Sequence, residues 1–169
     1  MRSIIILTNA LVYLFFLGCS NGAKKASSYA DSLMLIQQES SKAATELLSN
    51  MDSYNDTIRA FAAIDTLNRQ LDLSIKKAER ISFDGDSVFK LSLLNTLKIY
   101  QGFTKAELRE ISRLLSKSDS LFTRVDSSRL HQLSKDITIK SGEAEKKLKE
   151  VQREFAQKHQ LILEKTKPR

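Results

Sequence analysis

The feature that most constrains this chain is the spacing of its apolar residues, which recur every three or four positions from Tyr29 almost to the C-terminus. That spacing gathers apolar side chains on one face of a helix. Helix-breaking residues are rare, since 169 residues contain five glycines and a single proline, Pro168. Sheet proteins need clusters of turn residues roughly every 8–12 positions, and these are missing. The sequence therefore predicts an all-α fold.

The apolar pattern divides into four runs, separated by short stretches rich in residues that favour turns and caps. The first break falls at 49–56, although a helix running through it stays open because apolar residues there keep the spacing. The clearest turn is "SFDGDS" at 82–87, and "SKSDS" at 116–120 ends the third run. Four amphipathic helices with short loops predict an antiparallel up-down bundle over 28–165. We expect its helices at about 28–49, 56–81, 86–116 and 126–163.

Polar residues mark the expected helix ends and the solvent face of the last run. Ser27 or Ser28 is predicted to cap the first helix, and Asp86 the third. The last run contains glutamates followed four residues later by lysines, a spacing that stabilises a helix surface by a few tenths of a kcal/mol per pair. These expected pairs are Glu143/Lys147, Glu145/Lys149 and Glu154/Lys158.

The first 18 residues have the pattern of a secretion signal. Arg2 supplies a positive start, and the stretch from Ile4 to Leu17 is almost wholly apolar. This stretch is short for a membrane span, which needs about 20 residues, and its length is typical of a signal peptide. We therefore expect residues 1–18 to direct the chain out of the cytoplasm.

The only cysteine, Cys19, follows this apolar stretch in the sequence Phe16-Leu17-Gly18-Cys19, which resembles a bacterial lipobox. The resemblance implies cleavage before Cys19, attachment of diacylglycerol to its sulfur and acylation of its new amino group. Residues 19–27, "CSNGAKKAS", are then expected to form a flexible, lipidated tether. The alternative is an uncleaved anchor or an ordinary signal peptide.

A second resemblance covers most of the remaining chain. The motifs "YADSL" at 29–33, "FDGDS" at 83–87 and "FAQKHQLIL" at 155–163, with Tyr100 between them, are similar to an uncharacterised family of helical bacterial surface lipoproteins. "YNDTI" at 54–58 also fits the first of these motifs. The resemblance implies a helical bundle behind a lipobox and brings no catalytic residues.

No catalytic, cofactor or metal site is predicted. His131 and His159 are far apart and lack a metal-binding spacing. Ser-x-x-Lys occurs at 74–77 and 87–90 without the other elements of a serine β-lactamase. "DGDS" at 84–87 lacks the Asp-x-Asp-x-Asp-Gly pattern and the glutamate at position twelve of a calcium loop, and is better explained as a turn and helix cap. We therefore expect a protein that is not an enzyme.

The charge pattern bears on partners. The net charge of +7 arises from 27 basic and 20 acidic residues that are interleaved along the chain, and aromatic residues lie on the apolar stripes, so nucleic acid is not an expected ligand. We expect a non-catalytic structural or protein-interaction module, lipid-anchored to the cell or outer membrane and facing away from the cytoplasm, with another envelope protein as partner. The alternative is a carrier for a small apolar ligand or lipid.

Overall fold

The computed structural model describes residues 2–51, 56–84 and 86–161, and for residues 2–21 it describes the course of the backbone only. The described residues contain helices and no strand, which confirms the all-α prediction. In chain order the helices are α1 (Arg2–Asn50), α2 (Thr57–Arg80), α3 (Val88–Lys105), α4 (Glu107–Leu115) and α5 (Arg124–Lys158).

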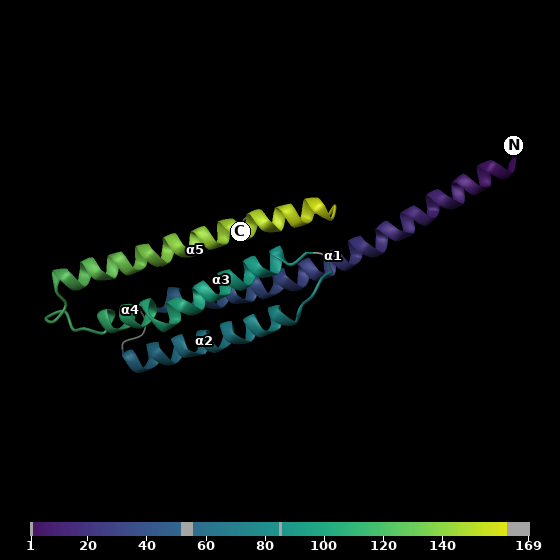
Figure 1. The fold of residues 1–169 in the computed structure, drawn as a ribbon. Coiled ribbons are helices and arrows are strands. Elements are labelled where there is room, and N and C mark those ends of the chain that lie inside the picture. Colours follow the sequence, from purple (N-terminus) through teal and green to yellow (C-terminus); the bar gives the residue numbers. More distant parts are fainter. Residues whose placement is uncertain (1, 52–55, 85, 162–169) are drawn as a thin grey trace.

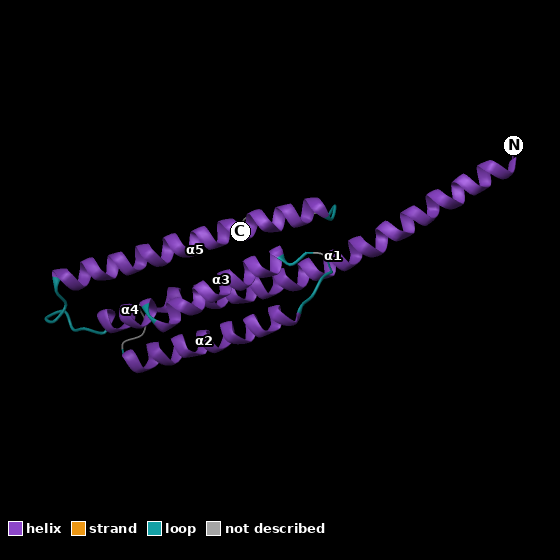
Figure 2. Cartoon of the chain, in the orientation of Figure 1, coloured by secondary structure: helices purple, strands orange, loops and turns teal. Residues whose placement is uncertain are grey.

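The helices form a bundle in which successive rods alternate in direction (Figure 1). α3 and α4 together make the third rod, so the five helices give the four-rod, up-down arrangement that the apolar runs predict. The connection between α4 and α5, residues 116–123, is described throughout and consists of turns and loop (Figure 2). The first part of α1 extends beyond the other helices, away from the bundle.

The core consists mainly of the predicted apolar stripes. Exceptions lie near one end of the bundle, where Ile58 is 80% exposed and Leu48 is 47% exposed. Burial of a large apolar side chain contributes about 1.5–3 kcal/mol, so these stripes supply most of the driving force for folding. Buried stripe residues include Tyr29, Leu33, Ile36, Leu47, Ile64, Leu67, Leu71, Ile75, Phe89, Leu93, Leu97, Tyr100, Phe103, Leu133, Leu148 and Phe155.

α1 and α2 are separate helices, as the turn-forming residues between them indicate. α2 begins after Asp56, whose side chain accepts a hydrogen bond from the Arg59 backbone N–H at 2.7 Å. A carboxylate in this place satisfies one of the free N–H groups of the first turn. The part of the break at 52–55 lies outside the described residues.

The start of the packed bundle differs from the prediction. Residues 19–27 were expected to form a flexible tether, but α1 is continuous through them and Ala26 is completely buried. Ser27 and Ser28 lie inside the helix and do not cap it. The physical reason is that Ala23 to Ala26 are good helix formers, and the small Ala26 side chain fits against the core.

The predicted helix over 86–116 is interrupted at Ala106, where the backbone leaves the helical region (φ −126°, ψ −78°) and separates α3 from α4. Two residues weaken the preceding turn. Gly102 has low helix propensity, and the Thr104 hydroxyl donates to the Gln101 carbonyl at 2.8 Å, a local bond that bends helices. The apolar stripe continues across the break, so the pattern alone does not reveal it.

α5 begins two residues earlier than predicted, because Thr123 and Asp126 form a reciprocal capping box. It ends at Lys158, short of the predicted 163. Gln160 adopts a positive φ of 54°, and Leu161 N–H donates to the Ala156 carbonyl at 2.8 Å. This is a Schellman ending, which the sequence hides because glutamine stands where glycine is usual. Residues 162 and 163 lie outside the described chain.

Candidate functional site

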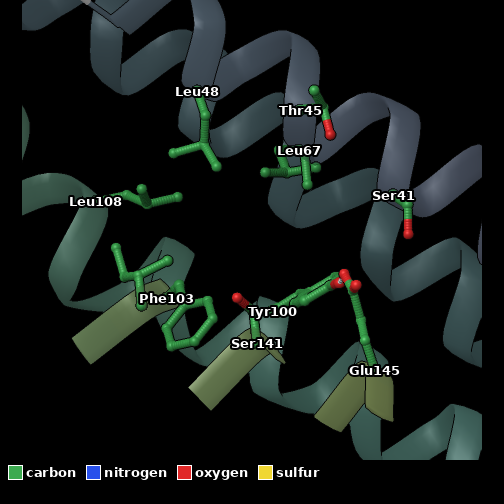
Figure 3. A pocket seen from close by; sticks show the side chains of 11 residues that line it. Ser41, Thr45, Leu48, Leu67, Tyr100, Phe103, Leu108, Ser141 and Glu145 are labelled. Carbon is green, nitrogen blue, oxygen red and sulfur yellow. Dashed lines mark hydrogen bonds between the residues drawn. The ribbon is translucent and has the colours of Figure 1, made fainter. Parts of the chain in front are cut away.

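A small pocket opens between α1 and α5 in the half of the bundle remote from the aromatic residues at 83 and 155 (Figure 3). Its volume is about 110 Å³. All five helices contribute to its wall, so the pocket lies where the rods meet. The lining residues are Ser41, Ala44, Thr45, Leu48, Leu67, Tyr100, Phe103, Leu108, Ile137, Ser141 and Glu145.

The pocket has an apolar floor and a partly polar rim. Leu67 of α2, Phe103 of α3 and Leu108 of α4 are buried and belong to the hydrophobic core. The Ser41 and Thr45 hydroxyls of α1 lie on one side of the pocket, and on the other side the Glu145 carboxylate of α5 meets the Tyr100 hydroxyl (Figure 3). An apolar cavity with a few polar groups at its edge is the usual form of a small-molecule site.

Space for the pocket arises from small side chains on the two facing helices. α1 contributes Ser41 and Ala44, and α5 contributes Ser141, where larger residues would fill the gap. Further along, the same two helices are joined by a hydrogen bond between the Gln37 and Gln152 side chains. The seam between α1 and α5 is therefore closed there and open at the pocket.

Tyr100 and Glu145 form the principal polar contact of the pocket. The Tyr100 hydroxyl donates to the Glu145 carboxylate. Burial raises the pKa of the Tyr100 hydroxyl, and the hydrogen bond and negative charge of Glu145 raise it further. The phenol therefore remains protonated near neutral pH and serves as a donor, while further lone pairs of the carboxylate remain available to accept from a ligand.

At the opposite end of the bundle, aromatic rings fill the space between α1 and α5. Rings of Tyr29, Phe83, Phe89, Phe155 and His159 pack together there, and we call them the aromatic cluster. Phe155 lies at the centre, with ring centroids 5.4 Å from Tyr29, 5.7 Å from Phe83, 5.6 Å from Phe89 and 4.4 Å from His159. Such tilted and edge-on ring pairs contribute beyond their buried area.

The structure shows where the histidines and Asp86, singled out from the sequence, lie in the fold. His131 is exposed, and His159 belongs to the aromatic cluster. Asp86 was expected to cap the third helix, but the N-cap position of α3 is Ser87, which makes no side-chain cap bond. Asp86 lies one residue earlier, accepts from the Val88 N–H at 3.1 Å and from the Lys158 ammonium at 2.9 Å, and so ties the start of α3 to α5. Lys158 therefore pairs with Asp86 where Glu154 was expected.

Cys19 is the predicted lipidation site. Cys19 lies on the backbone of α1, and its side chain is outside the described residues. Among the side chains that the structure does describe, no three His, Cys, Asp or Glu residues lie close enough together to hold a metal ion.

The sequence pattern did not reveal the pocket. It assigned Glu145 to a surface pair with Lys149 and Tyr100 to the apolar core. A signal was nevertheless present, because Ser141 and Glu145 flank the stripe residues Ile137 and Ala144 of the last helix. Small or polar residues beside a stripe indicate a place where helices do not close tightly.

The fold and the site together define a four-rod helical bundle with a ligand-sized pocket between its first and last helices. Comparison of the chain with family models, with curated proteins and with solved structures found no match. Over the residues searched, none of the helices combines the length and apolar character needed to cross a membrane.

Proposed function

We propose that the protein is a lipid-anchored, non-catalytic binding module of the bacterial cell envelope. The observation that carries this proposal is the lipobox-like sequence Phe16-Leu17-Gly18-Cys19, preceded by a signal-like apolar stretch and followed by a folded bundle. Diacylglycerol on the Cys19 sulfur, with an acyl group on its amino nitrogen, would hold the bundle at a membrane outside the cytoplasm, because two or more acyl chains give stable anchoring.

The position at which α1 begins to pack indicates how far the bundle would lie from the membrane. Ala26 is the first buried residue among the side chains that the structure describes, and it follows Cys19 by seven residues, which is about 10 Å along a helix. A bundle anchored in this way stays close to the lipid surface. The aromatic cluster is at the end of the bundle nearer the anchor, and the pocket is at the end further from it (Figure 1).

The proposed anchor is tested by metabolic labelling with palmitate in a bacterial host, followed by mass spectrometry of the mature N-terminus. We expect a labelled protein that begins at a diacylglyceryl-modified, N-acylated Cys19. Cys19→Ser should remove the label and leave an unprocessed precursor. Ser20→Ala, which changes the neighbouring residue, is the matched control and should be labelled normally.

Two results would contradict the anchor. One is wild-type protein without label, and the other is a mature N-terminus at a position other than Cys19. An envelope partner is sought separately by cross-linking in intact cells. A protein that cross-links reproducibly to the wild type and less efficiently to the Cys19→Ser variant would support a module that works at the membrane.

A second candidate function, a carrier of a small apolar ligand, is favoured by the pocket itself. The volume of about 110 Å³ is near that of an engineered protein cavity of about 150 Å³ that binds benzene. It accommodates one ring and is far too small for a long acyl chain. Native mass spectrometry of protein purified from its host should then show a low-molecular-weight ligand, and Ala44→Phe, which fills the pocket, should lose it.

A further inference from the structure

We propose that the pocket between α1 and α5 binds a small organic cation, with a ring-sized apolar body on the pocket floor and an ammonium group at Glu145. This inference rests on the second candidate function, binding of a small ligand, and names the chemistry of that ligand. It is independent of the anchor at Cys19.

The apolar part of the ligand follows from the floor of the pocket. Leu67, Phe103 and Leu108 are each at least nine-tenths buried and offer only carbon atoms to a ligand. Leu48 lies at the edge of the same space and is 47% exposed, so a bound ring would cover apolar surface that now meets water. Covering such surface contributes about 25 cal/mol per Å².

The positive charge of the ligand follows from Glu145. Several carboxylates pair with a cation from another helix, such as Asp65 with Arg109 and Glu110 with Arg129. None of the ion pairs formed by described residues includes Glu145. Its only described partner is the neutral Tyr100 hydroxyl. A charge-assisted hydrogen bond from an ammonium group is about twice as strong as a neutral one.

The rings beside the carboxylate also favour a cation. Tyr100 and Phe103 line the pocket with ring centroids 6.4 Å apart. A cation held near an aromatic face gains about 0.5–1 kcal/mol at exposed sites and more when water is excluded. An anionic ligand of the same size would meet the Glu145 carboxylate and is disfavoured by the like charge.

The test compares three ligands of nearly equal size and different charge: benzylamine, benzyl alcohol and benzoate. Each is titrated into the full-length chain in nanodiscs, with empty nanodiscs as the blank. Binding is followed by NMR of isotope-labelled leucine methyl groups, among which those of Leu48, Leu67 and Leu108 report on the pocket. We expect benzylamine to bind about tenfold more tightly than benzyl alcohol, and benzoate to show no saturable shift.

Three variants assign the effect to individual side chains. Glu145→Gln keeps the size of the side chain and removes its charge, so benzylamine should bind no better than benzyl alcohol. Glu143→Gln removes an exposed charge two residues away and should leave the tenfold preference intact. Ala44→Phe fills the pocket and should abolish the leucine shifts for all three ligands, with helical content and melting temperature measured to show that it folds.

The outcomes separate the two levels of the proposal. Equal binding of benzylamine and benzyl alcohol by the wild type would overturn the preference for a cation and leave a pocket for neutral ligands. No pocket shift with any of the three, or shifts unchanged by Ala44→Phe, would overturn ligand binding in this pocket as well. A tenfold preference that survives Glu145→Gln would show that another group carries it and would contradict the role given to Glu145.

Discussion

At the end of the bundle nearer Ala26, the seam between α1 and α5 is filled by the aromatic cluster, in which Phe155 contacts four other rings. At the other end the same two helices carry serine and alanine, and the pocket lies between them. One helix pair therefore combines a tightly packed region with an open one. The packed region holds the helices in register, and the open region leaves space that a ligand can enter.

Apolar residues are buried at both ends, but the local contacts differ. Rings pack together in the aromatic cluster, whereas near the pocket the capping box of Thr123 and Asp126 and the ion pair of Asp126 with Lys117 add polar contacts to the apolar core. Apolar contacts respond to side-chain volume, and polar contacts respond to pH. The four predictions below use this contrast.

The largest effect is expected for Phe155→Ala. Phe155 is 2% exposed, so truncation leaves a cavity at the centre of the aromatic cluster and should lower the free energy of unfolding by about 3–5 kcal/mol. Urea denaturation measures this change. Val125→Ala, at an exposed position on the same helix, is the control and should change stability by less than about 0.5 kcal/mol. A small decrease in the free energy of unfolding for Phe155→Ala would mean that the aromatic cluster is not tightly packed.

A second prediction makes the same substitution at both ends of α1. Ala26→Leu adds volume where the side chain is fully buried and should cost about 1–3 kcal/mol through overpacking. Ala44→Leu adds the same atoms beside the pocket and should be neutral or stabilising. Thermal unfolding of both variants gives the comparison directly, and equal losses would show that the pocket is not free space.

The third prediction concerns acid. Hydrogen bonds from Lys117 and Thr123 lower the pKa of Asp126 to about 2, below its unfolded value of about 3.9. The stabilisation is therefore complete above about pH 4 and is lost as the pH falls toward 2. Urea denaturation between pH 7 and pH 2 should show this loss in the wild type.

Two variants test whether Asp126 is responsible. Asp126→Asn should remove that part of the pH dependence, whereas Asp119→Asn, at an exposed loop position, should keep it. At neutral pH, Thr123→Ala removes the cap of α5 and should cost about 1 kcal/mol. If the free energy of unfolding of Asp126→Asn fell with pH as it does in the wild type, Asp126 would not be the source of the acid sensitivity.

The smallest effect is expected for Gln160→Gly at the end of α5. Gln160 has a positive φ, which glycine adopts without steric cost, so the substitution should raise stability by about 0.5–1 kcal/mol. Gln157→Gly is the matched control inside the helix and should lower stability by about 1 kcal/mol. Differential scanning calorimetry measures whether each substitution raises or lowers the melting temperature. Destabilisation by Gln160→Gly would contradict the Schellman ending.

The sequence was sufficient to predict the fold class because its apolar period is long and rarely interrupted. It was less informative where a local bond overrides propensity, as at Ala106 and Gln160, since neither residue type indicates a helix end. The pocket was missed for a different reason. Its existence depends on which small residues face each other, and Ala44 and Ser141 are almost 100 positions apart in the chain, so only the packed structure brings them together.

The order of the rods has a consequence for how the chain folds. α1 packs on α2, α2 on α3, and α3 on both α4 and α5, so most partners are neighbours in sequence, and chains of this kind fold in microseconds to milliseconds. The seam between α1 and α5 is different, because Gln37 and Gln152 are separated by 115 residues and must close a long loop before they meet. We therefore expect this seam to form last, after the other helices have assembled.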